Sequence, residues 1–208
     1  MKLTPICITP GNLLTFVLGY AKIILVIKMI YSYNEALKKY KTRYNLEKAI
    51  NNNEIYRQDH GIYSDERIVN PIIIASLKYP NAILTMDSAF YYYNLTDVIP
   101  SKICLATNRN SDVINNDKIT QFFVPKDKLN CGKTKVDMDG YLVNIYDKER
   151  LLVELMRKRK QISFDYYKEI IANYRNIVDE LDMEKIETYL SLYKNDITIG
   201  NLLLREVF

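Results

Sequence analysis

The sequence predicts an α+β protein with two parts: a small N-terminal domain, and a larger domain that mixes helices with a short β-sheet and ends in helices. Three observations predict it. Two short capped helix patterns occupy residues 32–53, and an alternating hairpin pattern follows at 54–64. Short β-rich runs lie between residues 102 and 146. Everything after Asp147 has helical periodicity.

The bulk composition is that of an ordinary globular protein. The chain has 208 residues, of which 48% are hydrophobic and 26% charged, so a disordered chain is not expected. The 29 basic and 25 acidic residues give a net charge of +4, which is informative only if it is concentrated. Cys7, Cys104 and Cys131 lie far apart, and the chain has one histidine. This pattern predicts no metal site, no cofactor and no disulfide framework, and it favours a cytoplasmic protein.

Residues 1–30 form a separate apolar segment. Residues 12–33 are strongly apolar, but Lys22 and Lys28 interrupt them, whereas a membrane-spanning helix needs about 20 largely uncharged residues. Three interpretations stay open: a membrane anchor, a helix packed on the body, or sequence upstream of the true start. We favour the third because Met29 directly precedes the first capped helix. A stable membrane association is therefore not favoured.

Residues 31–66 have the order of a compact winged helix-turn-helix. Ser32 and Glu35 form a capping box for a helix that runs to about Tyr40, and Thr42 is a candidate N-cap for a second helix. Leu46, Ala49 and Ile50 would form its buried stripe, and the asparagines at 51–53 would end it. An alternating stretch around Gly61 then predicts a hairpin.

Residues 67–208 are predicted to form the larger domain, because the pattern changes near residue 65. Residues 67–84 predict a buried helix that ends near Tyr79 and Pro80. Residues 85–100 predict another helix, stopped by Pro100. The runs 102–107 and 119–126 predict strands, and Asp139-Gly140 predicts the turn of a hairpin over 133–147. Four helical segments follow.

Basic and hydrogen-bonding side chains gather on the predicted second helix and hairpin. Residues 38–58 contain six basic and two acidic residues, a local charge of +4, which would attract phosphates. Arginine and asparagine can read base edges in the major groove, and the early residues of the second helix face the bases in a helix-turn-helix. The sequence therefore predicts double-stranded DNA as a partner, contacted by Arg43, Tyr44, Asn45, Lys48, Asn51, Arg57 and His60.

Other functions find less support in the sequence. The chain has only six glycines and no glycine-rich phosphate loop, and a Ser-His-Asp hydrolase would have to use His60. A nuclease built on Asp137, Asp139 and Asp147 would lack a specific spacing, so no catalytic residues are predicted. A second basic cluster, Arg157, Lys158, Arg159 and Lys160, either stabilises a helix C-terminus or contacts the DNA backbone or an acidic partner.

Three segments resemble the AbiEi-type antitoxins of bacterial abortive-infection systems. They are EIYRQDHGIYSDE (54–66), YPNAILTMDSAFYYYNLTDVIPSKICLAT (79–107) and VNIYDKERLLVELMRKR (143–159), and the resemblance covers about residues 31–195. It implies a winged helix that represses its own operon at inverted repeats, and an antitoxin domain that counters a nucleotidyltransferase toxin. A stable complex with this toxin is not required. The matching DNA contacts are residues 43–48 and Arg57, and the family offers no catalytic residues.

The chain departs from this family at its start. The helix that usually precedes the helix-turn-helix is replaced by the apolar residues 12–30. The leading expectation is a cytoplasmic, non-enzymatic transcriptional regulator and antitoxin. The alternative is an AbiG-like phage-defence protein whose winged helix contacts another protein instead of DNA.

Overall fold

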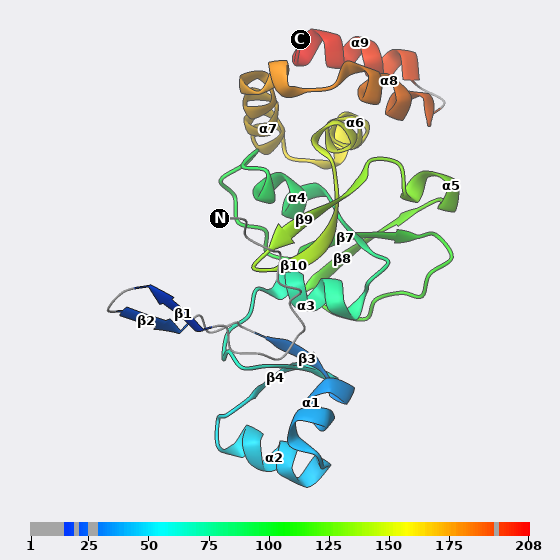
Figure 1. Ribbon diagram of the computed structural model, residues 1–208. Helices are drawn as coiled ribbons and strands as arrows, with labels where there is room; N and C mark the ends of the chain where they lie inside the picture. The colour runs from blue at the N-terminus through cyan, green and yellow to red at the C-terminus, as the bar shows by residue number, and fades with distance from the viewer. Residues whose placement is uncertain (1–14, 19–20, 25–28, 194–195) are drawn as a thin grey trace. The chain divides into compact units, whose positions relative to one another are not determined.

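The computed structural model describes residues 15–18, 21–24, 29–193 and 196–208. The chain divides into two compact units, here the N-terminal unit (residues 1–69) and the C-terminal unit (residues 70–208). Both contain helices and strands, so the α+β class is confirmed (Figure 1). The observed division falls a few residues after the predicted boundary between 66 and 67. Each unit is described by itself below.

Residues 29–69 of the N-terminal unit form two short helices and a three-stranded antiparallel sheet. The strand order is β3-β5-β4, so the first strand pairs with the last and encloses both helices in sequence. The elements are β3 (Ile30–Ser32), α1 (Tyr33–Tyr40), α2 (Arg43–Asn51), β4 (Tyr56–Asp59) and β5 (Ile62–Ser64). The predicted hairpin over 54–64 is confirmed as β4 and β5. The strand β3 is not part of the sequence prediction.

The apolar segment is not helical where it is described. β1 (Thr15–Leu18) and β2 (Ala21–Ile24) form a two-stranded antiparallel sheet, so the interpretation as one packed helix is wrong for these residues. The rest of residues 1–28, and the question of whether the protein starts at Met29, lie outside the described residues. No helix among the residues that the structure describes is both long and apolar enough to cross a membrane.

The C-terminal unit is built on a mixed five-stranded sheet of order β8-β7-β6-β10-β9. β7 and β8 are parallel, as are β6 and β10, while the other two pairs are antiparallel. The strands are β6 (Ile83–Leu84), β7 (Ile103–Asn108), β8 (Ile119–Val124), β9 (Lys133–Met138) and β10 (Tyr141–Tyr146). The β9–β10 hairpin turns at Asp139 and Gly140, whose φ angles of 51° and 86° fit the predicted turn.

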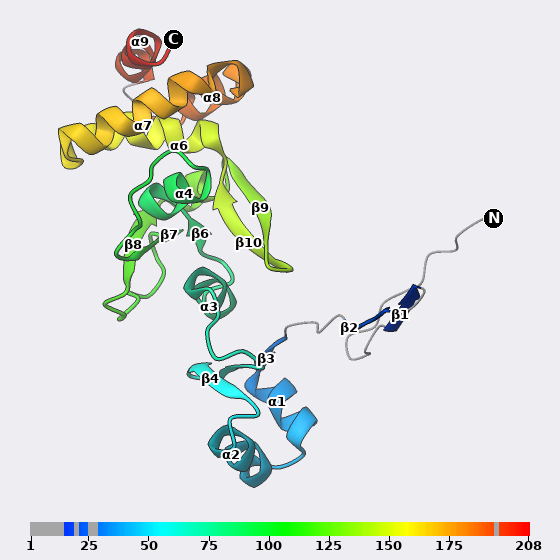
Figure 2. The ribbon, with the colours of Figure 1, turned by 90° about the vertical axis from the view of Figure 1, so that its left-hand side faces the viewer.

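Helices cover this sheet on both sides. α4 and α6 lie on one side and α3 on the other, and α7, α8 and α9 pack beyond α6 (Figures 1 and 2). The predicted helical character after Asp147 is confirmed. The helical elements are α3 (Pro71–Lys78), α4 (Met86–Tyr92), α5 (Lys126–Leu129), α6 (Lys148–Lys158), η1 (Arg159–Gln161), α7 (Phe164–Asn176), η2 (Val178–Glu180), α8 (Met183–Ser191) and α9 (Asp196–Glu206).

Two predicted helices are shorter than expected. The helix predicted within residues 67–84 ends at Lys78, next to the predicted break at Tyr79 and Pro80, but it begins only at Pro71. Ile83 and Leu84, beyond the break, form β6. The helix predicted to reach Pro100 ends at Tyr92, because Asn94 takes a left-handed backbone with φ 56°. Beyond it, the Glu169 carboxylate of α7 accepts hydrogen bonds from the Thr96 hydroxyl and the Asp97 N–H, at 2.7 and 3.0 Å. These contacts from a distant helix hold the chain out of helical geometry.

The buried Arg150 crosses the interior of the C-terminal unit. Its guanidinium donates to the Glu154 carboxylate at 2.9 Å and to the Tyr193 hydroxyl at 2.5 Å, while its Nε and Nη1 have no hydrogen-bond partner among the described residues. Gly132 (φ +75°) makes room for this side chain, since a Cβ built there would lie 2.5 Å from the Arg150 Cβ. The position of Arg150 therefore depends on a glycine at 132.

We expect Gly132→Ala to destabilise the C-terminal unit far more than Gly140→Ala does. Both glycines have a positive φ, but a Cβ at Gly140 would meet nothing within 4 Å. Gly140→Ala should cost about 1–2 kcal/mol in unfolding free energy from backbone strain alone. Gly132→Ala should cost roughly 1–3 kcal/mol more, because Arg150 must move. Urea denaturation followed by circular dichroism measures both, and equal losses would contradict this account.

Candidate nucleic-acid interface

The two helices of the N-terminal unit begin and end where local side chains fix them. The Ser32 hydroxyl accepts from the Glu35 N–H at 3.4 Å, and the Glu35 carboxylate accepts from the Ser32 N–H at 2.8 Å, so the predicted capping box is confirmed. The Thr42 hydroxyl accepts from the Asn45 N–H at 3.1 Å and caps α2, as predicted. Between the helices, Lys41 has a φ of 69°. A single residue in this conformation reverses the chain into α2.

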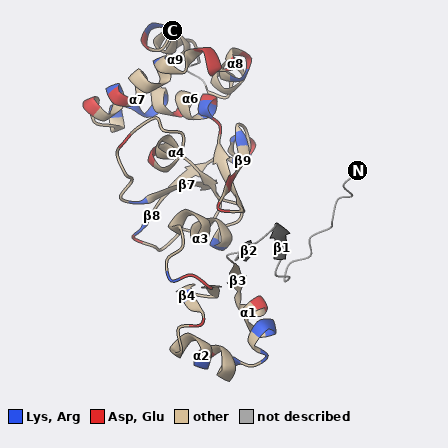
Figure 3. Ribbon diagram, turned by 60° about the vertical axis from the view of Figure 1, so that its left-hand side comes forward, with Lys and Arg blue, Asp and Glu red and all other residues tan. Residues whose placement is uncertain are grey.

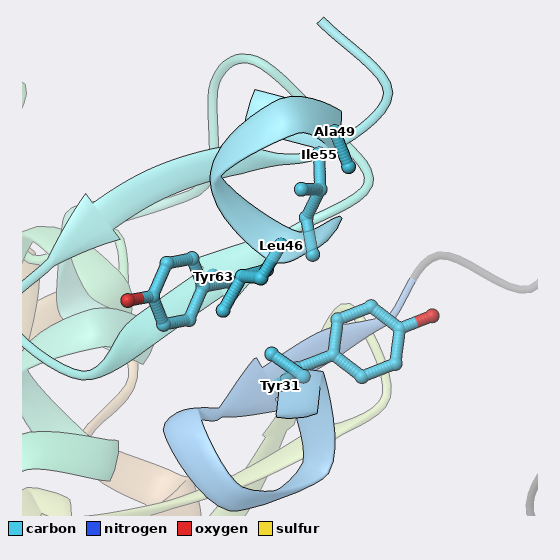
Figure 4. Close-up of a cluster of buried hydrophobic side chains, with 6 residues drawn as sticks. Tyr31, Leu46, Ala49, Ile55 and Tyr63 are labelled. Carbon is cyan, nitrogen blue, oxygen red and sulfur yellow. The ribbon is translucent and has the colours of Figure 1, made fainter. Parts of the chain in front are cut away.

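Two apolar side chains attach α2 to the unit. Leu46 and Ala49 are 2% and 3% exposed and pack in one cluster with residues of the sheet and of α1. Figure 4 shows Leu46 beside Tyr63 and Ala49 beside Ile55. The third member of the predicted stripe, Ile50, is only partly buried at the edge of the cluster. The cluster consists of Tyr31, Ala36, Leu46, Ala49, Ile55 and Tyr63.

A cation, a phenol and a carboxylate join α1 to the two neighbouring strands. The Lys39 ammonium donates to the Tyr31 hydroxyl and to the Asp65 carboxylate, both at 2.8 Å, and the Tyr31 hydroxyl donates to the other Asp65 oxygen. Burial by itself would lower the pKa of Lys39, but the hydrogen bonds to Asp65 and Tyr31 outweigh it and raise the pKa to about 12. Lys39 therefore stays charged and serves the fold.

The residues of α2 predicted to contact DNA lie outside the core, with Tyr44, Lys48 and Asn51 opposite the buried stripe and Arg43 and Asn45 beside it. Arg43, Tyr44, Asn45, Lys48 and Asn51 are all exposed, and the Arg43 side chain is 78% exposed. Arg43 donates to the Glu47 carboxylate one turn later at 2.9 Å. The Asn45 amide donates to the Tyr40 carbonyl at 3.2 Å, which ties α2 to the end of α1. The polar face of α2 is thus open to a partner, although two of its members already have local contacts.

A hollow of about 400 Å³ brings helix and hairpin residues together. It contains the predicted Arg43 of α2 and the predicted Arg57 and His60 of the hairpin. Tyr44, Asn45, Lys48 and Asn51 do not line it. The other lining residues, which the sequence prediction missed, are Tyr33, Leu46, Glu47, Ile50, Gly61 and Tyr63. Of these, Tyr33 and Tyr63 carried no signal, because tyrosine is common throughout the chain.

The tip of the hairpin fixes where His60 lies. Gly61 has a φ of +76°, and the Asp59 carboxylate accepts from the His60 N–H at 2.6 Å. The register of the strand pair shifts between Arg57 and Asp59, which is the mark of a β-bulge. The imidazole of His60 is exposed and faces the hollow together with the exposed Arg57.

The second predicted basic cluster lies at the end of α6, and most of its side chains contact other residues of the same chain. Arg157 donates to the Glu154 carboxylate at 2.9 Å and lies 3.5 Å from the centre of the Tyr193 ring. Lys158 lies 3.8 Å from the centre of the Phe122 ring, and Arg159 pairs with Glu206 at 3.5 Å. Only Lys160 has no partner among the described residues. The four side chains therefore do not form one shared cationic surface.

The described residues contain no group of three or more His, Cys, Asp or Glu side chains that could hold a metal ion.

Comparison with known proteins indicates the fold and nothing finer. No family model matches the chain, and no curated protein matches it either. Among solved structures, it is similar to the RV2827C protein from Mycobacterium tuberculosis, with a TM-score of 0.59 and 12% sequence identity over 81% of this chain and 68% of that one. An identity this low makes the likeness one of fold alone.

We expect Asp65→Asn to weaken the N-terminal unit at neutral pH, since it removes the charged partner of Lys39. Both side chains are partly exposed, at 32% and 40%, so the loss in unfolding free energy should be about 1 kcal/mol. Because the pKa of Lys39 is raised in the fold, this stabilisation is present at neutral pH and disappears as the pH rises through about 12. Urea denaturation at pH 7 measures the loss.

The matched control is Glu47→Gln, which removes one carboxylate from the exposed pair with Arg43 in the same unit. It should change the unfolding free energy by less than about 0.5 kcal/mol. A loss as large as that of Asp65→Asn would show that the hydrogen bonds of Lys39 have no special role in the fold.

Proposed function

We propose that residues 29–69 form a winged helix-turn-helix that binds double-stranded DNA. The order of strand, two helices and hairpin supports this proposal, as does the pairing of β3 with β5. In this assignment α2 enters the major groove and the β4–β5 hairpin is the wing. The observation that carries the proposal is the exposed polar face of α2, together with the hollow in which Arg43 of that helix lies near Arg57 and His60 of the hairpin.

Each DNA contact is assigned by the chemistry of its side chain. Arg43 and Asn45 lie in the first turn of α2 and have the donors and acceptors that read guanine and adenine edges. Tyr44 lies beside them and is 74% exposed. Lys48 and Asn51 lie further along the same exposed side, where they would meet phosphates. Arg57 and His60 would meet the backbone or the minor groove from the wing.

The proposed attraction to DNA depends on where the positive charges lie, because the net charge of this unit is small. Residues 29–69 contain seven basic and six acidic residues, a net charge of +1. The excess of +4 is confined to residues 38–58, on α1, α2 and β4 (Figure 3, blue). Few phosphates would be neutralised, so the salt dependence of binding should be shallow.

The proposed biological role is that of an AbiEi-type regulator and antitoxin in the cytoplasm. The N-terminal unit would repress its own promoter at inverted repeats, and the C-terminal unit would counter a cognate nucleotidyltransferase toxin without catalysing a reaction. Two of the resembling segments support this role. Residues 79–107 include α4 and β7, and residues 143–159 include α6, the helix at the centre of the C-terminal unit.

We expect Arg43→Glu with Lys48→Glu to abolish binding to the DNA upstream of the gene. Both side chains are exposed, so the fold should stay intact while two phosphate- or base-facing cations become repulsive. The control is Lys102→Glu with Lys118→Glu, the same change of charge on exposed residues of the C-terminal unit. A mobility-shift assay should show a loss of at least about hundredfold for the first variant and a much smaller change for the second.

Neutralising a single phosphate contact tests the same interface by its salt dependence. Lys48→Ala should reduce the slope of log affinity against log salt concentration by about one unit. If wild-type protein with an intact fold shifts no upstream DNA, the regulator is excluded and binding of a protein partner by this unit becomes the better explanation.

We expect the antitoxin activity to be separable from DNA binding. Full-length protein with Arg43→Glu and Lys48→Glu should still rescue cells that express the adjacent nucleotidyltransferase-like gene, because the C-terminal unit is unchanged. Growth after toxin induction measures the rescue, and a reporter on the native promoter should be derepressed in the same strain. Loss of rescue together with loss of repression would place both activities on the N-terminal unit.

A further inference from the structure

A cavity lies in the C-terminal unit, apart from the residues assigned to DNA binding. Its volume is about 620 Å³, within the range of small-molecule sites. Its walls come from the turn between α3 and β6, the end of β7, the loop that follows it, and α5 with the start of β9. All of its lining residues fall between Lys78 and Lys133, so it belongs to this unit alone.

The charge of the lining is predominantly positive. Lys78, Lys126 and Lys133 contribute three ammonium groups, and Asp112 contributes the only carboxylate in the lining. Lys126 of α5 and Lys133 of β9 are seven residues apart, whereas Lys78 of α3 is distant from both in the sequence. Five side-chain amides line the same space: Asn81, Asn108, Asn115, Gln121 and Asn130. The Gln121 amide is used within the protein, so the asparagines offer the donors and acceptors for a ligand.

The loop on one side of the cavity is held in place from inside. The Gln121 side chain of β8 accepts from the Ile114 N–H at 2.7 Å, and it donates to the Thr107 hydroxyl at 2.7 Å and to the Asp112 carbonyl at 3.0 Å. Asn108 accepts from the Asn110 N–H at 2.8 Å at the start of the loop. On the other side, Asn144 donates to the Pro80 carbonyl at 2.9 Å. The walls are therefore formed before any ligand arrives.

The position of the cavity in the sheet also favours a ligand site. β7 and β8 are parallel, and Asn108 ends β7 at the cavity wall. In mixed and parallel sheets, ligands gather outside the carboxyl ends of parallel strands, where the loops diverge. Here the loop after β7 diverges toward Ser111–Asn115 while β8 continues into α5, and the cavity lies between them.

We propose that this cavity binds a small phosphorylated ligand of the nucleotide class. The three lysines would neutralise phosphate oxygens, and the side-chain amides and Tyr79 would contact the remainder of the ligand. The site lies outside the unit assigned to DNA and does not depend on DNA binding. It would give the C-terminal unit a ligand-bound and a ligand-free form.

The test is isothermal titration of full-length protein with ATP, GTP, tripolyphosphate and adenosine. Wild-type protein should bind the phosphorylated probes and not adenosine. Lys126→Ala with Lys133→Ala should weaken the binding at least about tenfold, since each lost charged hydrogen bond is worth about a factor of ten. The control, Lys102→Ala with Lys118→Ala, removes two exposed lysines outside the cavity and should change affinity less than twofold.

A second variant tests the site without removing a lysine. Ser111→Glu adds a carboxylate to the exposed loop at the cavity wall and should weaken binding of every phosphorylated probe. ATP or GTP should bind more tightly than tripolyphosphate, and tripolyphosphate binding as tight as that of both nucleotides would overturn the assignment to the nucleotide class. The proposal is overturned if no phosphorylated probe binds, if adenosine binds equally well, or if the control variant loses as much affinity.

Discussion

The N-terminal unit depends on the burial of two side chains, Leu46 and Ala49, from a nine-residue helix. A helix of this length is marginal in water by itself, so α2 exists because these side chains pack on the sheet and on α1. Burial of a leucine contributes about 1.5–3 kcal/mol, which is large for so small a unit. Because the attachment is so narrow, nearly all other positions of α2 are left exposed. An element that buries so little and displays arginine, lysine and asparagine is suited to contact a partner, and this is why α2 carries the functional proposal.

The number of positive charges in this unit does not predict its affinity for phosphate, because some of these cations are paired within the fold. Lys39 belongs to the predicted basic stretch, but its ammonium lies between Tyr31 and Asp65 and holds α1 to the strands. Arg43 is exposed, yet a phosphate would have to compete with Glu47 for it. Lys48 and Arg57 have no such partner among the described residues. The contribution of each cation to binding is therefore set by its neighbours and not by the local sum of charge.

Features fixed by neighbouring residues could be predicted from the sequence, and features fixed by distant ones could not. The Ser32–Glu35 box, the Thr42 cap and the turn at Asp139-Gly140 each need only a few adjacent residues. By contrast, β3 exists because Tyr31 pairs with Tyr63, and the chain after Asn94 is held by Glu169. The hollow between α2 and the hairpin was predicted in part, because three of its nine lining residues were chosen for their chemistry. The lysine-lined cavity was not predicted, because only the fold brings Lys78 to Lys126 and Lys133.

Charged side chains at the centre of the C-terminal unit are also held by residues distant in the sequence. Arg150 is fully buried between Glu154 and the rings of Tyr146 and Tyr193, and Arg157 completes the group over Tyr193. A buried pair of this kind adds little net stability, but breaking one partner is costly, so it fixes how α6 and the end of α8 meet. With Lys158 on Phe122 and Arg159 on Glu206, the most basic run in the sequence is largely used by the fold. The cations that remain without such partners among the described residues include Lys48, Arg57, Lys126 and Lys133, and these four lie at the two surfaces where anionic ligands are proposed.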